Sequence, residues 1–181
     1  VNPTIVEYLL NKSKKLLLES NKGGVNKSEF LIYPESIFIV GMPRSGSTLL
    51  ESILSMNEDV FDLGEINILE ESFLEFKKSR HDMNLAKIYE KNVKNKTELN
   101  ISTNKCLYNY LYTGIIANHI PNAKIIHCFR HPLDNILSIY RAHFAKGNAY
   151  SSSLVDCARV YLDQEELMNK YKNRFRSRIY D

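Results

Sequence analysis

IFIVGMPRSGSTLL, the stretch from residue 37 to residue 50, joins an apolar run to a second, helix-like run through a glycine-containing loop. The first run, Ile37 to Val40, is wholly apolar and bounded by Gly41, which is typical of a strand buried on both faces of a parallel sheet. After the loop, the sequence predicts a helix from about Gly46 to Met56. Its inward stripe is expected to consist of Leu49, Leu50, Ile53 and Leu54. The stretch therefore predicts a strand–loop–helix unit.

The alternation of strand and helix continues along the rest of the chain. Short strands are predicted near 60–63, 99–102 and 124–129, and residues 178–180 look like the start of another. Helices are predicted near 67–77, 84–93, 108–119 and 152–171. One more helix is expected to bury a face formed by Leu133, Ile136, Leu137, Tyr140 and Phe144. This order indicates right-handed βαβ units, so the predicted fold class is α/β, a parallel sheet flanked by helices.

The length of 181 residues predicts one compact domain. Residues 1–35 are predicted to form an amphipathic helix from Pro3 to about Ser20 and a linker around Asn21 to Asn26, followed by the main domain at 36–181. The formal net charge of +3 is too small to indicate a nucleic-acid coat, so any anion site must be local. No apolar run approaches the ~20 residues needed to cross a bilayer. We therefore expect no membrane span and a cytoplasmic location.

The loop from Gly41 to Thr48 has the chemistry of an anion site. Lying between a buried strand and a helix, it presents consecutive backbone N–H groups and the positive end of the helix dipole. Its spacing fits the P-loop frame G-x-x-x-x-G-K-[ST], except that Ser47 stands in place of the lysine. Arg44 is the only cation of the loop, so a bound phosphate would be neutralised from a different side. The alternative is an ordinary glycine turn capped by Ser47 or Thr48.

The run from Pro43 to Leu50 resembles the loop of sulfotransferases that binds a 5'-phosphosulfate, with the pattern Pro-(Lys/Arg)-Ser-Gly-(Thr/Ser)-(Thr/Ser)-Leu. Downstream, Arg130 ends a predicted strand and Ser138 follows eight residues later, which resembles the family's 3'-phosphate motif. The resemblance covers about residues 36–171. It is greatest to bacterial sulfotransferase domains found behind tetratricopeptide repeats and to tyrosylprotein sulfotransferases. Because these relatives usually continue with another strand and a C-terminal segment, the resemblance implies a domain truncated at its C-terminus.

The resemblance implies an enzyme that moves a sulfuryl group from 3'-phosphoadenosine 5'-phosphosulfate to a hydroxyl or amine. Arg130 and Ser138 would bind the donor's 3'-phosphate, and the loop would bind its 5' side. The loop residues concerned are Arg44, Ser45, Gly46, Ser47 and Thr48. The acceptor would be a carbohydrate, lipid, peptide or small metabolite rather than a nucleic acid.

Two further residues match catalytic positions of the family. Glu65, in Gly64-Glu65 after the second predicted strand, resembles the catalytic base, and Lys105 matches a lysine aimed at the leaving sulfonate. The chain departs from the pattern at Asn104, where relatives commonly have Asp. It departs again at Asn67, where tyrosylprotein sulfotransferases have Arg, and this argues against a protein-tyrosine acceptor. Because a sulfuryl group carries less charge than a phosphoryl group, fixed cations can suffice, and no metal is expected.

The cysteines and histidines do not indicate a metal site. Cys106, Cys128 and Cys157 include no C-x-x-C pair and are expected to be buried free thiols. His127 and His131 lie four residues apart, but Pro132 follows at once and would break a helix that placed them on one face.

Two alternatives to a sulfotransferase stay open at the level of sequence. A P-loop kinase or NTPase should have a lysine in the loop and a magnesium-binding Asp at a strand end, for which Asp62 is only a weak candidate. A fragment that binds a nucleotide or a partner without catalysis is the other.

Overall fold

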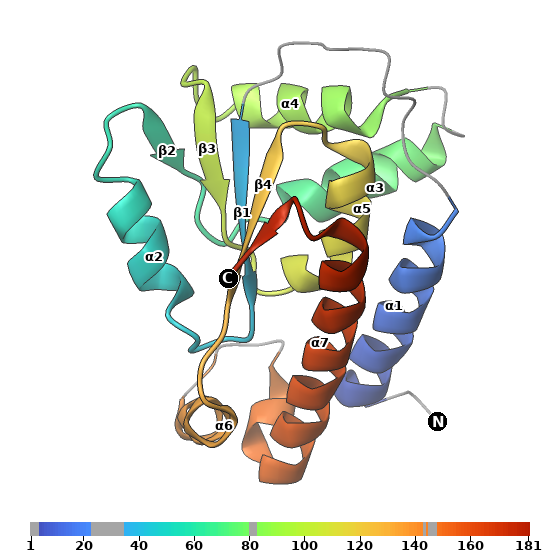
Figure 1. Cartoon of the computed structure of the whole chain (residues 1–181), viewed down its shortest axis with the longest axis vertical. Helices are drawn as coiled ribbons and strands as arrows, with labels where there is room; N and C mark the ends of the chain where they lie inside the picture. The colour runs from blue at the N-terminus through green and yellow to red at the C-terminus, as the bar shows by residue number, and fades with distance from the viewer. Residues whose placement is uncertain (1–3, 23–34, 80–82, 143, 145–147) are drawn as a thin grey trace.

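The computed structural model describes residues 4–22, 35–79, 83–142, 144 and 148–181, and Figure 1 shows a mixed α/β fold. The strands are β1 (Glu35–Gly41), β2 (Val60–Asp62), β3 (Ile101–Asn104), β4 (Ala123–Cys128) and β5 (Ile179–Tyr180). The helices are α1 (Ile5–Ser20), α2 (Ser47–Leu54), α3 (Ile68–Lys78), α4 (Leu85–Lys94), α5 (Thr113–His119), α6 (Pro132–Arg141) and α7 (Leu154–Phe175), with 3₁₀ turns η1 (Asn109–Tyr112) and η2 (Ala149–Ser152). The linker predicted around residues 21–26 lies mostly outside the described residues.

The strands form one parallel sheet in the order β2-β3-β1-β4-β5, which confirms the predicted fold class. β1 lies at the centre, and its residues Phe38, Ile39 and Val40 are at most 1% exposed. The apolar run is therefore the buried strand that its composition predicts. The chain places β2 and β3 on one side of β1 and β4 and β5 on the other. The carboxyl edge between β1 and β4 is thus a topological switch point, where α/β proteins bind ligands.

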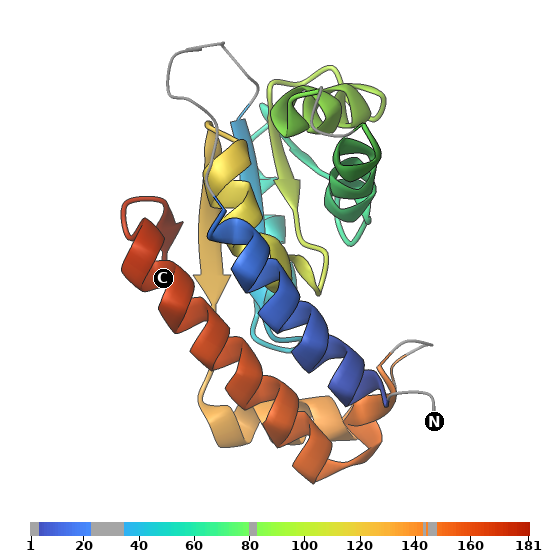
Figure 2. The ribbon, with the colours of Figure 1, turned by 90° about the vertical axis from the view of Figure 1, so that its right-hand side faces the viewer.

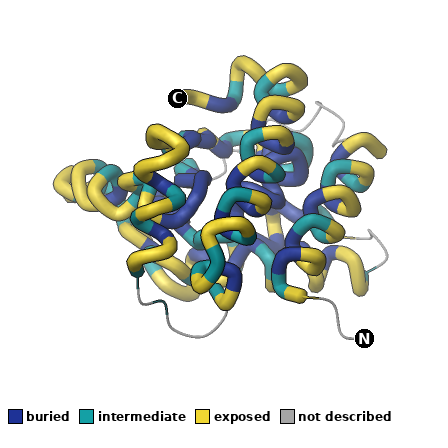
Figure 3. Tube along the Cα trace, turned by 90° about the horizontal axis from the view of Figure 1, so that it is seen from below, coloured by how far each residue is buried: buried dark blue, intermediate teal, exposed yellow. Residues whose placement is uncertain are grey.

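Helices pack around the sheet in pairs. α1 packs against α7, and α3 packs against α4, as the two perpendicular views show (Figures 1 and 2). α1 begins at a capping box formed by Thr4 and Glu7 and buries Val6, Leu9 and Leu16. These side chains join the same core as the sheet. Figure 3 shows the buried trace at the centre and the exposed turns of the helices outside it.

The inward face predicted for α2 is wrong. Leu49 and Ile53 are 68% and 54% exposed, Leu50 and Leu54 are partly buried, and Glu51 is the buried residue of the helix. Apolar periodicity identifies a helix, but the loop before α2 sets the rotation of the helix about its axis. That rotation turns a carboxylate toward the strand ends.

The face predicted for α6 is right only in part, because Ile136 and Phe144 are partly buried and pack against the core whereas its other three residues do not. Leu133, Leu137 and Tyr140 are exposed, whereas Asn135 and Ile139 are fully buried. The amide of Asn135 can be buried because it donates a hydrogen bond to the backbone carbonyl of Pro43. Sequence periodicity carries no information about such a partner.

Candidate active site

The carboxyl edge of the sheet gathers the residues that the sequence singles out. The glycine loop follows β1, Glu65 follows β2, Lys105 follows β3 directly and Arg130 follows β4. Because these four strands are parallel neighbours, their carboxyl ends meet at one edge. The fold therefore brings together four segments that lie far apart in the sequence.

The loop after β1 turns through conformations that side chains rarely adopt. Arg44 has φ +66° and Gly46 has φ +102°. α2 begins directly afterwards, and its N-cap, Gly46, provides no side-chain cap. The positive end of the helix is therefore open to an anion. Asn135 of α6 holds the loop from below, because its Nδ2 donates to the carbonyl of Pro43 at 2.9 Å.

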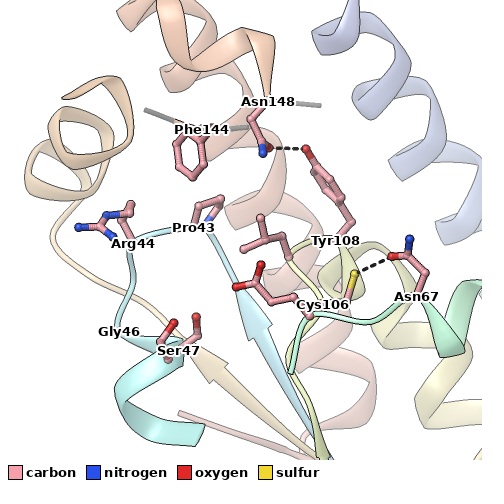
Figure 4. Close-up of a pocket in the computed structure, with 12 residues that line it drawn as sticks. Pro43, Arg44, Gly46, Ser47, Asn67, Cys106, Tyr108, Phe144 and Asn148 are labelled. Atoms are coloured by element: carbon pink, nitrogen blue, oxygen red, sulfur yellow. Dashed lines mark hydrogen bonds between the residues drawn. The ribbon is translucent and has the colours of Figure 1, made fainter. Parts of the chain in front are cut away.

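A cleft of about 610 Å³ lies in front of this loop. Figure 4 shows the loop on one side of the cleft and Asn67, Cys106 and Tyr108 on the opposite side. The described lining residues are Pro43, Arg44, Gly46, Ser47, Thr48, Glu65, Asn67, Cys106, Leu107, Tyr108, Phe144 and Asn148. One side of the cleft thus carries helix amides and a guanidinium, and the other carries mostly neutral side chains.

Glu65 and Lys105 form an ion pair at this cleft. The Nζ atom of Lys105 donates to Oε1 of Glu65 at 2.6 Å. The lysine side chain is 6% exposed and that of Glu65 is 50% exposed. Asn104 fixes the turn before the lysine, since its Oδ1 accepts from Nδ2 of Asn109 at 2.6 Å and from the backbone N–H of Cys106 at 3.3 Å. The two predicted catalytic residues therefore touch, one buried and the other open to the cleft.

A second carboxylate, which the sequence analysis missed, lies behind Lys105. Oε2 of Glu51 lies 3.9 Å from Nζ of Lys105. Its Oε1 accepts hydrogen bonds from Oγ1 of Thr103 at 2.8 Å and from the backbone N–H of Gly64 at 3.2 Å. The signal in the sequence is a glutamate set between the apolar positions of a short helix.

A second hollow, of about 330 Å³, adjoins the cleft at Arg44, which lines both. Three arginines and one carboxylate line it, together with Ser138; its described residues are Arg44, Arg130, Asp134, Leu137, Ser138, Arg141 and Ala142. The excess of guanidinium groups makes it attractive to an anion. Nε of Arg44 donates to Oγ of Ser138 at 3.3 Å, and a hydroxyl that accepts a hydrogen bond keeps its own hydrogen to donate. Arg141 is a member of this site that the sequence analysis did not predict.

The side of the cleft opposite the loop carries neutral side chains apart from Glu65. The hydroxyl of Tyr108 donates to Oδ1 of Asn148 at 2.6 Å, and the thiol of Cys106 donates to Oδ1 of Asn67 at 3.2 Å. Burial raises the pKa of Tyr108 to about 12 and also raises the pKa of the Cys106 thiol. Both groups therefore stay protonated near neutral pH. Among the described residues on this side of the cleft, Glu65 carries the charge.

The structure places Ser45 and the cysteines differently from the other predicted positions. Ser45 lines neither hollow, and its Oγ is buried without a hydrogen-bond partner among the described atoms. Each of the other predicted binding residues lines at least one of the two hollows. All three cysteines are free, but only Cys157 is fully buried, whereas Cys106 and Cys128 are half-buried.

His127 belongs to the core rather than to this site. Its ring is 2% exposed, and its Nε2 lies 2.9 Å from Nε2 of Gln164 in α7. Within the described part of the chain, no three His, Cys, Asp or Glu side chains are grouped so that they could hold a metal ion. None of the described helices is long and apolar enough to span a membrane.

Comparisons with known proteins identify the family and the fold. A family model described as "Sulfotransferase family" matches residues 34–102 and 78–181. An uncharacterized protein of Aquifex aeolicus (strain VF5) is 29% identical, over 80% of this chain and 22% of that protein. The solved sulfotransferase domain from the curacin biosynthetic pathway has the same fold, with a TM-score of 0.58 at 19% identity over 81% of this chain and 66% of that domain. The chain thus spans about a fifth of the length of the first relative and just under two thirds of the second.

Proposed function

The chain belongs to the sulfotransferase family, and from this we propose that it binds 3'-phosphoadenosine 5'-phosphosulfate and transfers the sulfuryl group to a hydroxyl or amine acceptor. The observation that carries the proposal is the pair of adjoining hollows at the carboxyl edge of the sheet. One hollow is rich in arginine, and the other joins an uncapped helix start to a carboxylate–ammonium pair.

The chemistry of the hollows fits a donor with two separate anionic groups. The loop amides and the start of α2 suit the 5' side, because amides at a helix N-terminus favour an anion. Arg130 and Ser138 suit the 3'-phosphate, because a guanidinium lies beside a neutral hydroxyl donor. Arg141, one turn further along α6, lines the same hollow. Arg44 lines both hollows and so can interact with either end of the nucleotide.

The catalytic roles follow from the position and charge of three side chains. Glu65, open to the cleft, accepts the proton of the attacking hydroxyl or amine. Lys105 and Arg44 stabilise the negative charge that grows on the leaving phosphate oxygen as the sulfur–oxygen bond breaks. The bound donor supplies the activated sulfuryl group.

The neutral side of the cleft favours an uncharged acceptor. Apolar contacts from Leu107 and Phe144 and the hydrogen-bonded Tyr108–Asn148 pair suit an alcohol or amine attached to an apolar group. An acidic acceptor would be repelled by Glu65, because the cation beside that carboxylate, Lys105, is only 6% exposed and is already paired with Glu65.

Calorimetric titration of the chain with adenosine 3',5'-bisphosphate, 5'-AMP and ATP–Mg²⁺ tests the proposal. We expect the bisphosphate to bind about 10-fold or more tightly than 5'-AMP, because a charge-assisted hydrogen bond is worth roughly 1.5–3 kcal/mol. Tighter binding of ATP–Mg²⁺ would favour a kinase or NTPase, and no binding of any nucleotide would refute the proposal. Transfer of label from a radioactive donor to neutral and to acidic alcohols then tests the acceptor class.

A further inference from the structure

Glu51 is a buried carboxylate in α2, whose other side chains are partly buried or exposed. It is 5% exposed and is the buried residue of α2. Removing a carboxylate from water is costly unless specific partners replace the solvent. The position of Glu51 therefore depends on the groups that it meets.

Those groups come from the ends of two strands. One oxygen of Glu51 accepts from Thr103, the penultimate residue of β3, and from the backbone N–H of Gly64, which directly precedes Glu65. The other oxygen faces Nζ of Lys105 at 3.9 Å. The backbone N–H of Lys105 in turn donates to the carbonyl of Gly64 at 3.0 Å. Glu51 thus joins the helix of the anion loop to the segments that carry both catalytic residues.

Lys105 lies between two carboxylates that differ in exposure and in hydrogen bonding. The side chain of Glu51 is 7% exposed and is held by two hydrogen bonds, whereas that of Glu65 is 50% exposed and opens into the cleft. In this structure Lys105 contacts the oxygen of Glu65 that would have to accept a proton. Turnover requires these two side chains to separate, the lysine toward the donor and the carboxylate toward the acceptor.

We propose that Glu51 is a positioning residue: the fixed counter-ion that keeps Lys105 in place while the lysine exchanges Glu65 for the anionic donor. The inference rests on the proposed function. Without Glu51, Glu65 would be the carboxylate that balances a buried ammonium, so the ion pair that occupies the base would be harder to open. With Glu51 in place, the lysine keeps a negative neighbour throughout.

The variant Glu51→Gln separates this role from a structural one. A glutamine oxygen can still accept from Thr103 and Gly64, so the link between α2 and the strands is kept while the charge is removed. Thr103→Val does the reverse, because it deletes one of those hydrogen bonds and keeps the charge. Glu19→Gln, in a surface ion pair with Lys77 on α1 and α3, is the matched control for the loss of a carboxylate.

We expect Glu51→Gln to lower kcat by about 10- to 100-fold, the range that misplaced catalytic groups commonly cost. The dissociation constant of adenosine 3',5'-bisphosphate should change by less than about threefold, since the loop and the arginine hollow are intact. Thr103→Val should lose at least about fivefold less in kcat than Glu51→Gln, and Glu19→Gln should behave as the wild type. A wild-type kcat in Glu51→Gln, or equal losses in Glu51→Gln and Thr103→Val, would overturn the proposal.

A second measurement does not depend on turnover. Competitive acetylation with acetic anhydride, read by mass spectrometry against the exposed Lys22, reports how often the buried Nζ of Lys105 leaves its position and becomes accessible. Labelling of Lys105 should rise about threefold or more in Glu51→Gln, because the fixed counter-ion is lost, and stay unchanged in Thr103→Val. Unchanged labelling in Glu51→Gln would contradict the role of Glu51 as counter-ion. If the wild type transfers no sulfuryl group at all, the proposed function fails while this result still decides the role of Glu51.

Discussion

Glu65, the proposed base, has half of its side chain exposed, and its Oε1 lies 2.6 Å from the buried ammonium of Lys105, from which it must separate before it can accept a proton. The ammonium holds the carboxylate at the edge of the cleft, and the exposure gives an acceptor access to it. At the other hollow, the guanidinium of Arg130 and the neutral hydroxyl of Ser138 line one space. At this scale each role can be tested by removing one group.

Glu65→Gln keeps the shape of the side chain and removes the group that accepts the proton. We expect turnover to fall by about 10²- to 10⁴-fold, with nucleotide affinity nearly unchanged. Steady-state rates and calorimetry measure the two quantities. Asp62→Asn is the control, because Asp62 is exposed at the end of β2 and lines neither hollow. Wild-type turnover in Glu65→Gln would show that another group is the base.

Arg130→Ala should weaken adenosine 3',5'-bisphosphate by about 10- to 150-fold while barely changing 5'-AMP, which has no 3'-phosphate for Arg130 to bind. Arg44→Ala should weaken both nucleotides, because Arg44 lines the loop cleft as well as the arginine hollow. Titration of both nucleotides against both variants checks this. Equal losses for the two nucleotides in Arg130→Ala would refute the assignment of Arg130.

At the scale of elements, the site depends on how closely β1 approaches β4. Gly41 ends β1 opposite Cys128, in register with the last residue of β4. Its φ of +142° and the nearby carbonyl leave no room for a side chain. This close approach brings the anion loop beside the segment that carries Arg130.

Gly41→Ala should therefore lower stability more than a substitution at a glycine with a positive φ but open space around it. A Cβ atom at Gly41 would lie 2.2 Å from the carbonyl oxygen of Cys128, so β1 and β4 would have to separate. We expect a loss of more than about 3 kcal/mol in the free energy of unfolding, against about 1–2 kcal/mol for Gly64→Ala, which is strained but has open space. Denaturant titration of both variants checks the difference, and similar losses would contradict it.

His127 predicts how the contact between β4 and α7 responds to pH. Burial, and then the nearby charge of Lys172, lower the pKa of His127 to about 4, although Asp181 acts in the opposite sense. The unfolded chain takes up this proton near pH 6.5 and the folded chain does not, so stability is lost as pH falls from about 6.5 to 4. Between pH 7.5 and 5, the wild type should lose about 1–2 kcal/mol more than His127→Gln. Equal losses in urea titrations at the two pH values would exclude this histidine as the cause.

At the scale of the whole molecule, the sheet brings its fixed cations to one edge. Arg44, Lys105, Arg130 and Arg141 come from segments after β1, after β3, after β4 and within α6. Cations on separate elements can contact both anionic groups of the proposed nucleotide, which lie too far apart for the cations of a single loop.

Transfer should therefore persist in excess EDTA, because the roles that kinases give to Mg²⁺ are here assigned to side chains of the protein. The measurement is the rate of label transfer before and after chelation, with a Mg²⁺ add-back as the control. Loss of activity in EDTA and recovery with Mg²⁺ would support the kinase-like alternative instead.

The sequence by itself determined the local units and which residues follow the strand ends. A four-residue apolar run followed by a glycine loop predicts a buried strand and an anion site, because both depend on residues adjacent in the chain. The alternation of strands and helices predicts a parallel sheet, whose carboxyl ends gather Glu65, Lys105 and Arg130 at one edge. The loop residues Arg44, Gly46, Ser47 and Thr48 line the cleft at that edge, and their binding of the donor stays a prediction.

Only the tertiary structure decided which groups meet across that edge. The strand order places β3 and β4 on either side of β1, so that the segments after these three strands lie side by side. Periodicity placed some residues of both helices wrongly and missed Glu51 and Asn135 as buried residues, because these two find polar partners that lie 52 and 92 residues away along the chain. A buried polar group is stable only where such a partner exists, and partners at that separation are set by packing rather than by the local sequence.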